Sequence, residues 1–526
     1  MVFDRLSRKY GISHSGDFIA LGKAEAEAEA LPSSTIPLRC VYEDYNNLLK
    51  LLSNENFIVV GRKGSGKSAF AEYVYSLSVD EPNIFCKFIR QQEANLEHLV
   101  QIGSDLGHSV EKENLYKWLI LTNILKLFSD NKAIENNRNF TLLGQFLKKN
   151  SGFIDIQGSE VKELVEKQGF EVNVEYLKRY FRSKLNKTLE IKQEKAPFFK
   201  LIPHLREVVL NVLTSTEEKK NNNSYVLFFD DLDISFDSSN QSSIDSLVSL
   251  LRVTKEVNNE LFGKNELESK VILLLRDDIS KTISSNATDT AKIFSSYSSN
   301  VSWYQDDYHQ SDSETNLNIR KFINKRIEYS FNKMGYSINK SDPWKSLVQE
   351  PFSENRDRHH TKTSFKYILD HTFFRPRDII LFFKPLETHK YVIPLRKHDV
   401  NHLIGRYCDE VMNELKNELS CFYSKNKITM LFNAIGKISR ECKDSENNSC
   451  SYQKAVQAIN ENCEDVDPYS ILDDLFERSM IGNMSGSKFA FFKYREPKNS
   501  VYTFNKTLDV ILHNSIKVFT TNKGYA

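Results

Sequence analysis

The stretch "NFIVVGRKGSGKSAF", residues 56–70, is the most informative part of this sequence for the fold. Its first half, 57–60, is a run of aromatic and β-branched residues that predicts a short buried strand. Its second half has the spacing G-x-x-x-x-G-K-[ST], and the residues that follow favour a helix. Glycines at these positions let backbone N–H groups turn inward on a phosphate at the positive end of that helix. The stretch therefore predicts a phosphate-binding loop between a strand and a helix.

Each residue of this loop has an expected role in binding a nucleotide. The expected phosphate cradle consists of Gly61, Arg62, Lys63, Gly64, Ser65, Gly66, Lys67 and Ser68. Lys67 would reach the β and γ phosphates, and the Ser68 hydroxyl would hold Mg²⁺. The loop alone thus predicts a nucleoside triphosphate and a divalent metal as ligands.

A second apolar run, "SYVLFFDDLDIS" at 224–235, ends in three acidic residues. Carboxylates this dense at the end of a buried strand repel one another unless a cation lies among them. A magnesium-bound nucleotide supplies that cation. We expect Asp230 to belong to the Mg²⁺ shell and Asp231 to orient or deprotonate the attacking water.

An arginine follows the next apolar run, "VILLL" at 271–275. The unbroken apolar run suits a strand buried on both faces. Arg276 then lies at the sheet edge where doubly wound folds bind their ligands, so we interpret it as a γ-phosphate sensor. The alternative is a salt bridge to Asp277 or Asp278 within the same loop.

Two further arginines lie in "TFFRPRDIILFF", residues 372–383. The proline and the following aspartate predict that a helix begins here. Arg375 and Arg377 place two cations against the positive end of that helix, which is unfavourable unless an anion offsets them. The anion is either a nucleotide phosphate, in the same or a neighbouring subunit, or a carboxylate of Asp370 or Asp378.

Length and pattern divide the 526 residues into four expected parts. They are an N-terminal lead-in and helix at 1–50, a P-loop core at 51–310 with a helical insertion at 91–223, a helical lid at 311–420, and a winged-helix-like domain at 421–526. The core is expected to be an α/β fold with a parallel sheet. In the first part, "AEAEAEA" at 24–30 is expected to form a solvated helix.

Composition excludes several classes of protein. Lys and Arg number 71 and Asp and Glu 70, so no global field draws the chain to nucleic acid or to a membrane. The most apolar run, 115–128, is short and broken by lysines, and the N-terminus lacks the apolar region of a signal peptide. Seven dispersed cysteines without a C-x-x-C motif indicate reduced thiols. We expect a cytoplasmic protein with no membrane partner.

The last part reads as three helices and then a hairpin with strands at 488–495 and 500–505, the pattern of a winged helix. Residues 488–523 contain seven cations and two acids, so the hairpin could touch nucleic-acid phosphates. The third helix, however, carries three acids against one arginine, and a phosphate-lined groove repels this net negative charge. We favour a protein-contact module, with nucleic-acid binding as the alternative.

Four motifs in this order, "GRKGSGKSA", "FFDDLD", "LLLRDD" and "FFRPRD", resemble the bacterial P-loop ATPases related to the STAND, KAP and AAA+ branches, many of them encoded in antiviral defence loci. The resemblance implies a three-layer ATPase core, ATP and Mg²⁺ as cofactors, hydrolysis of ATP and self-assembly into a homo-oligomer. It also makes Arg276 sensor-like, and Arg375 with Arg377 similar to a second sensor or finger. Asp231 replaces the usual glutamate with a shorter side chain, which predicts slow hydrolysis.

The resemblance implies a function as an oligomeric ATPase that switches or assembles an antiviral defence complex with an effector partner. The alternative is an ATP-dependent DNA-binding protein of the origin-recognition type. KAP members often carry transmembrane segments, and this sequence shows no run long enough to be one.

Overall fold

The structure is a computed structural model of the chain. It describes residues 18–90, 111–129, 138–151, 171–215, 223–234, 236–305, 311–350, 363–445, 447–463, 466–485, 490–496 and 502–524. The chain divides into two compact units. The sheet unit comprises residues 46–62 and 67–301, and the helical unit comprises residues 1–45, 63–66 and 302–526. The four-part division expected from the sequence stays a prediction.

A five-stranded parallel sheet organises the sheet unit. Its strands are β1 (Ile58–Gly61), β2 (Ile84–Ile89), β5 (Ser224–Phe229), β6 (Lys270–Leu275) and β7 (Ser298–Val301). Their order across the sheet is β2-β5-β6-β1-β7, so β6 lies between the strand before the loop and the strand before the acids. The carboxyl ends of these parallel strands share one edge, which brings the predicted loop and the predicted acids to the same side of the fold.

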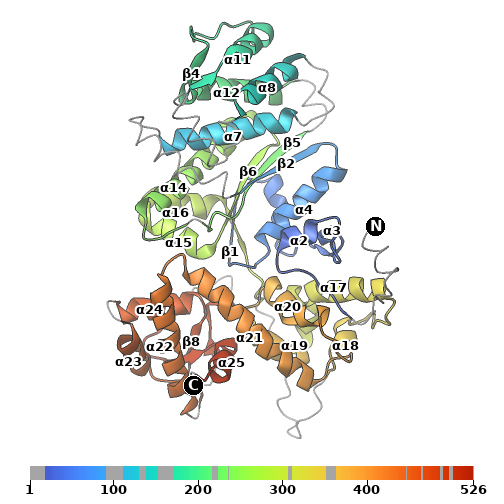
Figure 1. Cartoon of the computed structure of the whole chain (residues 1–526), viewed down its shortest axis with the longest axis vertical. Helices are drawn as coiled ribbons and strands as arrows, with labels where there is room; N and C mark the ends of the chain where they lie inside the picture. The colour runs from blue at the N-terminus through green and yellow to red at the C-terminus, as the bar shows by residue number, and fades with distance from the viewer. Residues whose placement is uncertain are drawn as a thin grey trace, which may run out of the picture. The chain divides into compact units, whose positions relative to one another are not determined.

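Helices cover both faces of this sheet (Figure 1). On one face lies α4 (Lys67–Asp80), and on the other lie α14 (Gln241–Glu256), α15 (Asp277–Asn286) and α16 (Thr288–Tyr297). The core between them is aromatic, since the Phe70 and Phe228 rings meet edge to face with centroids 5.7 Å apart. The short helical turns η1 (Leu48–Leu52), η4 (Val257–Phe262) and η5 (Gly263–Asn265) complete this part. The expected three-layer α/β fold is confirmed.

The insertion between β2 and β5 is mostly helical where the structure describes it. Its elements are α7 (Lys112–Ser129), α8 (Arg138–Lys149), β3 (Glu171–Asn173), α11 (Glu175–Tyr180), η3 (Phe181–Leu185), β4 (Lys195–Pro197) and α12 (Phe198–Leu213). The helix α7 packs against α12, α14 and β5, which fixes the insertion to the core. The antiparallel pair β3–β4 was not predicted, because three-residue strands are too short to show an alternating pattern.

The helical unit is built on one continuous apolar core. Its elements before residue 420 are α2 (Ala26–Ala30), α3 (Leu38–Val41), η7 (Ser311–Asn316), α17 (Asn318–Met334), α18 (Trp344–Leu347), α19 (Ser364–Leu369), α20 (Pro376–Phe383), η8 (Lys384–Glu387) and α21 (Lys397–Leu419). The helix α20 begins at its proline, as the sequence predicts. Among the described residues, no helix combines the length and the apolar character needed to cross a lipid bilayer.

The C-terminal part contains the three predicted helices and a small antiparallel sheet. The elements are α22 (Lys425–Lys443), α23 (Tyr452–Asn462), α24 (Pro468–Glu477), β8 (Ile481–Met484), β9 (Ala490–Phe491), η9 (Lys493–Arg495), β10 (Asp509–Leu512) and α25 (Asn514–Asn522). The predicted hairpin partner is wrong: residues 502–505 form no strand, and β9 pairs with β8, which pairs with β10. The rest of the expected hairpin, 488–489 and 497–501, lies outside the described residues.

The "AEAEAEA" segment is a helix, but one of its glutamates is buried. Glu29 is 2% exposed and forms a two-pronged ion pair with Arg326 of α17, with nitrogen to oxygen distances of 2.6 and 2.8 Å. Arg326 also donates to the carbonyl of Leu21. The expectation of a wholly solvated helix is therefore wrong at Glu29, because a partner almost three hundred residues away compensates its burial.

Removing one partner of this buried pair should destabilise the helical unit strongly. Arg326→Ala leaves the Glu29 carboxylate buried without its cation, and we expect a loss of about 3–5 kcal/mol in the free energy of unfolding. Urea unfolding followed by tryptophan fluorescence measures it. The control is Lys384→Ala, which breaks an exposed pair with Glu410 and should cost less than about 1 kcal/mol. Equal losses in both variants would contradict this account.

Candidate functional site

The loop after β1 has the backbone that a phosphate cradle requires. Gly64 and Gly66 have φ angles of +78° and +99°, a region that residues with a side chain rarely adopt. The helix α4 begins directly afterwards at Lys67, so its first N–H groups have no intrahelical partner and face the loop. The loop can therefore present backbone donors to an anion at a helix N-terminus.

The side chain of Lys67 folds back onto its own loop. Its ammonium group donates to the carbonyl of Gly61 at 2.7 Å and to the carbonyl of Arg62 at 3.1 Å. Burial lowers the pKa of Lys67 below its ordinary value, and the nearby carboxylates of Asp277 and Asp230 oppose that effect. Among the described residues, the acceptors in hydrogen-bond contact with this buried ammonium are neutral carbonyls, and phosphate oxygens would be stronger acceptors for it.

The acids after β5 are close enough together to share a cation. Asp230 is 5% exposed, and one of its carboxylate oxygens accepts from the backbone N–H of Asp231 at 2.9 Å. Asp231 has φ +58°, a strained conformation for an aspartate that is typical of functional turns. Oxygens of the two carboxylates lie within 4.8 Å of each other. This all-oxygen donor set fits Mg²⁺, with the hydroxyl of Ser68 in the first turn of α4 as the further donor predicted from the sequence.

Arg276 lies among carboxylates of its own unit. It is 5% exposed, and its guanidinium pairs with Asp278 at 2.5 and 3.0 Å and with Asp233 at 3.1 Å. The salt-bridge alternative of the sequence analysis is thus present, and the role as a γ-phosphate sensor stays a prediction. Asp233 was not predicted as a partner, because the two residues are far apart in sequence and meet only through the pairing of β5 with β6.

Arg375, at the start of α20, also meets carboxylates rather than open space. It is 2% exposed and donates to Asp378 at 2.8 to 3.1 Å and to Glu418 of α21 at 3.1 Å. Burial lowers its pKa, but the charges of Asp378 and Glu418 outweigh burial and hold the pKa well above its ordinary value. The remaining described hydrogen bond of its guanidinium goes to the carbonyl of Lys63 at 3.0 Å. Asp378 is therefore the counter-charge, as one of the two sequence alternatives proposed.

Arg377 has a looser environment in the same unit. Its Nε donates to the carbonyl of Ala24 at 3.0 Å, and its guanidinium lies 3.8 Å from the carboxylate of Glu414. Burial raises the pKa of Glu414, although Arg377 and Arg375 oppose that shift. Asp370, the other predicted partner of these arginines, pairs with Arg495 instead. Both arginines of the motif are thus engaged within this chain.

Two of the seven cations considered for nucleic-acid binding are also paired. Lys493 forms an ion pair with Glu496 and donates to the carbonyl of Tyr502 at 2.8 Å. Arg495 pairs with Asp370 at 3.0 Å. Because carboxylates already neutralise these two side chains, they are less available to nucleic-acid phosphates than the sequence suggests.

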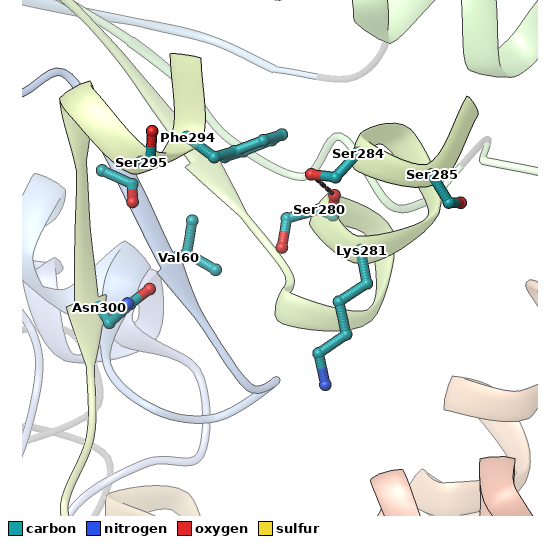
Figure 2. Close-up of a pocket in the computed structure, with 9 residues that line it drawn as sticks. Val60, Ser280, Lys281, Ser284, Ser285, Phe294, Ser295 and Asn300 are labelled. Atoms are coloured by element: carbon teal, nitrogen blue, oxygen red, sulfur yellow. Dashed lines mark hydrogen bonds between the residues drawn. The ribbon is translucent and has the colours of Figure 1, made fainter. Parts of the chain in front are cut away.

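An open hollow lies beside the strand that precedes the loop, with a volume of about 530 Å³. Figure 2 shows its lining, with Val60 of β1, Asn300 of β7, four labelled residues of α15 and two of α16. Several of the serine hydroxyls donate within their own helices, as Ser284 does to the carbonyl of Ser280. No sequence motif indicated this hollow, and its lining includes no carboxylate that could act on a nucleotide.

Comparison with known proteins adds one partial family match. A family model described as "FunZ-associated C-terminal helical domain" matches residues 317–414. The matched range covers α17 to α20 and most of α21, and it contains Arg375, Arg377 and Glu414. A search of curated proteins finds no significant match to this chain.

The solved structures that match this chain include two proteins. One is the ORC2 protein of Aeropyrum pernix in ADPNP and ADP complexes, at 13% identity and a TM-score of 0.38, with 98% of each chain covered. The other is Cdc6p of Pyrobaculum aerophilum, at 12% identity and a TM-score of 0.28, with 94% of this chain and 98% of that chain covered. A likeness at this level identifies neither a ligand nor a partner.

The backbone of the loop makes Gly64 sensitive to substitution. Gly64→Ala should lower the free energy of unfolding by about 1–2 kcal/mol, the cost of a left-handed conformation for a residue with a side chain. The added Cβ would also lie 2.9 Å from Cβ of Arg377. Thermal unfolding measures the loss. The control is Gly144→Ala in α8, where the space is open and a gain of about 0.5–1 kcal/mol is expected. A neutral Gly64→Ala would contradict the strained geometry.

Proposed function

We propose that this chain binds ATP with Mg²⁺ at the loop 61–68 and hydrolyses it slowly. The observation that supports the proposal is the shared edge of the parallel sheet, where the glycine-rich loop follows β1 and the paired carboxylates of Asp230 and Asp231 follow β5. Only one strand separates β1 from β5. A loop rich in N–H donors and a pair of carboxylates in this arrangement suit a triphosphate bound together with a divalent metal.

Each residue of the site has a proposed role in this chemistry. The N–H groups of 61–68 hold the phosphates, and Lys67 leaves the carbonyls of its own loop to contact the β and γ phosphates. Ser68 and Asp230 hold Mg²⁺, which when bound neutralises charge that develops on the phosphates. Asp231 orients the attacking water and accepts its proton. Its short side chain reaches less far than a glutamate, which is the reason for proposing a slow reaction.

Substitutions of the loop lysine and of the second aspartate should abolish most turnover. Lys67→Ala removes the phosphate-binding cation, and Asp231→Asn keeps the shape of the side chain while removing the base. We expect each to lower the rate of ATP hydrolysis at least about 100-fold, measured as phosphate release with Mg²⁺ present. Matched controls are Lys264→Ala and Asp245→Asn, whose side chains are exposed on helices and bond within them. Unchanged turnover in Lys67→Ala and Asp231→Asn would remove the assignment.

The finer functional reading rests on the resemblance described above. It comprises self-assembly into a homo-oligomer, an effector partner, a role in antiviral defence and a cytoplasmic location. All seven cysteines are free thiols, which suits a reducing compartment. Nucleic-acid binding through the C-terminal part has less support, because Lys493 and Arg495 are paired with carboxylates.

We expect the assembly of this chain into a homo-oligomer to depend on the bound nucleotide. We expect the particle mass measured by mass photometry to rise above that of a 61.0 kDa monomer when ATP and Mg²⁺ are added. Lys67→Ala should prevent the rise in particle mass, because it removes the cation that binds the nucleotide phosphates. A monomer at every nucleotide concentration would contradict the assembly proposal and leave the hydrolysis proposal standing.

A further inference from the structure

Three successive carbonyls of the loop accept hydrogen bonds from the body of the helical unit, to which residues 63–66 belong. The carbonyl of Lys63 accepts from Nη1 of Arg375 at 3.0 Å. The carbonyl of Gly64 accepts from the backbone N–H of Arg377 at 3.4 Å, and the carbonyl of Ser65 accepts from the indole Nε1 of Trp303 at 2.8 Å. We name these three donors the loop clamp.

The geometry of the peptide bond makes this contact significant for anion binding. In a trans peptide the carbonyl of one residue and the N–H of the next lie in one plane and point in opposite directions. When the clamp holds the carbonyls of 63, 64 and 65, the N–H groups of Gly64, Ser65 and Gly66 point away from the clamp. Those N–H groups are the ones that the loop is expected to offer to phosphate.

Two of the three clamp donors belong to side chains that cannot easily move, those of Arg375 and Trp303. Arg375 is held by two carboxylates and is 2% exposed, so it acts here as a fixed hydrogen-bond donor whose charge is already balanced. The ring of Trp303 meets Tyr45 and Phe322 edge to face, each with centroids 5.6 Å apart. Gly64 lies so close to Arg377 that a side chain at this position would have no room. The glycine therefore permits the close approach of the loop to Arg377.

We propose that Arg375, Arg377 and Trp303 are positioning residues that set the direction of the phosphate-binding N–H groups from outside the loop. The inference rests on the proposed nucleotide function and gives the "FFRPRD" motif a role other than contact with the nucleotide. It makes nucleotide affinity dependent on the packing of the helical unit. By linkage, nucleotide binding also strengthens the clamp.

The test removes one donor while keeping an aromatic ring at its position. Trp303→Phe deletes the indole N–H that holds the Ser65 carbonyl, and the loss of one hydrogen bond predicts a dissociation constant for Mg-ATP about 3- to 10-fold higher. The matched control is Trp344→Phe, which deletes the indole N–H bond to the Ser364 hydroxyl at 3.0 Å elsewhere in the same unit. The control should change the dissociation constant less than about twofold.

A second readout separates positioning from loss of stability. Hydrogen exchange of the amides of residues 64–66 in the protein saturated with Mg-ATP should speed up in Trp303→Phe and stay as in wild type in Trp344→Phe, because the clamp holds these amides toward the phosphates. Equal effects of the two variants on affinity and exchange would overturn the clamp and leave the nucleotide function intact. If wild type itself shows no affinity for Mg-ATP, the proposed function and the clamp's role in it both fail.

Discussion

The conformation of the phosphate-binding loop depends on the hydrogen bonds that its outward-facing carbonyls accept. A loop that turns its N–H groups toward a phosphate turns its carbonyls the other way, and each carbonyl left without a partner away from water costs free energy. Here the carbonyls of residues 61 and 62 accept from Lys67, and those of 63, 64 and 65 accept from the loop clamp. The left-handed Gly64, the buried Arg375 and its carboxylate partners all serve this arrangement.

This arrangement gives Lys67 two roles that exclude each other. In the structure its ammonium satisfies two backbone carbonyls, whereas the proposed function requires it on the phosphates. Burial disfavours the charged form of Lys67 and so lowers its pKa. An anion that enters the site would stabilise this charged form by pairing with it. The clamp has no such second role, because the carboxylates of Asp378 and Glu418 keep Arg375 in place. The contacts of Lys67 with the loop can therefore rearrange while the contacts of the clamp with the loop stay fixed.

Local sequence patterns predicted the fold and the phosphate-binding loop. Contacts between residues far apart in the sequence could not be predicted from such patterns. The strand before Gly61, the acids after Phe229 and the helix start at Pro376 are written in consecutive residues, and all three elements are present. Asp233 lies 43 residues from its partner Arg276, and Glu418 lies 43 residues from Arg375. Trp303 lies 238 residues from Ser65. No local spacing in the sequence indicates these pairs. Glu29 was misplaced for the same reason. The C-terminal hairpin was assigned the wrong strands because two-residue β9 carries no alternating pattern.

The most direct measurement is calorimetric titration of the wild-type protein with ATP, performed once with Mg²⁺ and once with a chelator. We expect saturable binding at one site per chain, with weaker affinity when the metal is removed, because the carboxylates after β5 then repel the phosphates. A folded protein that takes up no nucleoside triphosphate in the presence of Mg²⁺ would contradict the central claim.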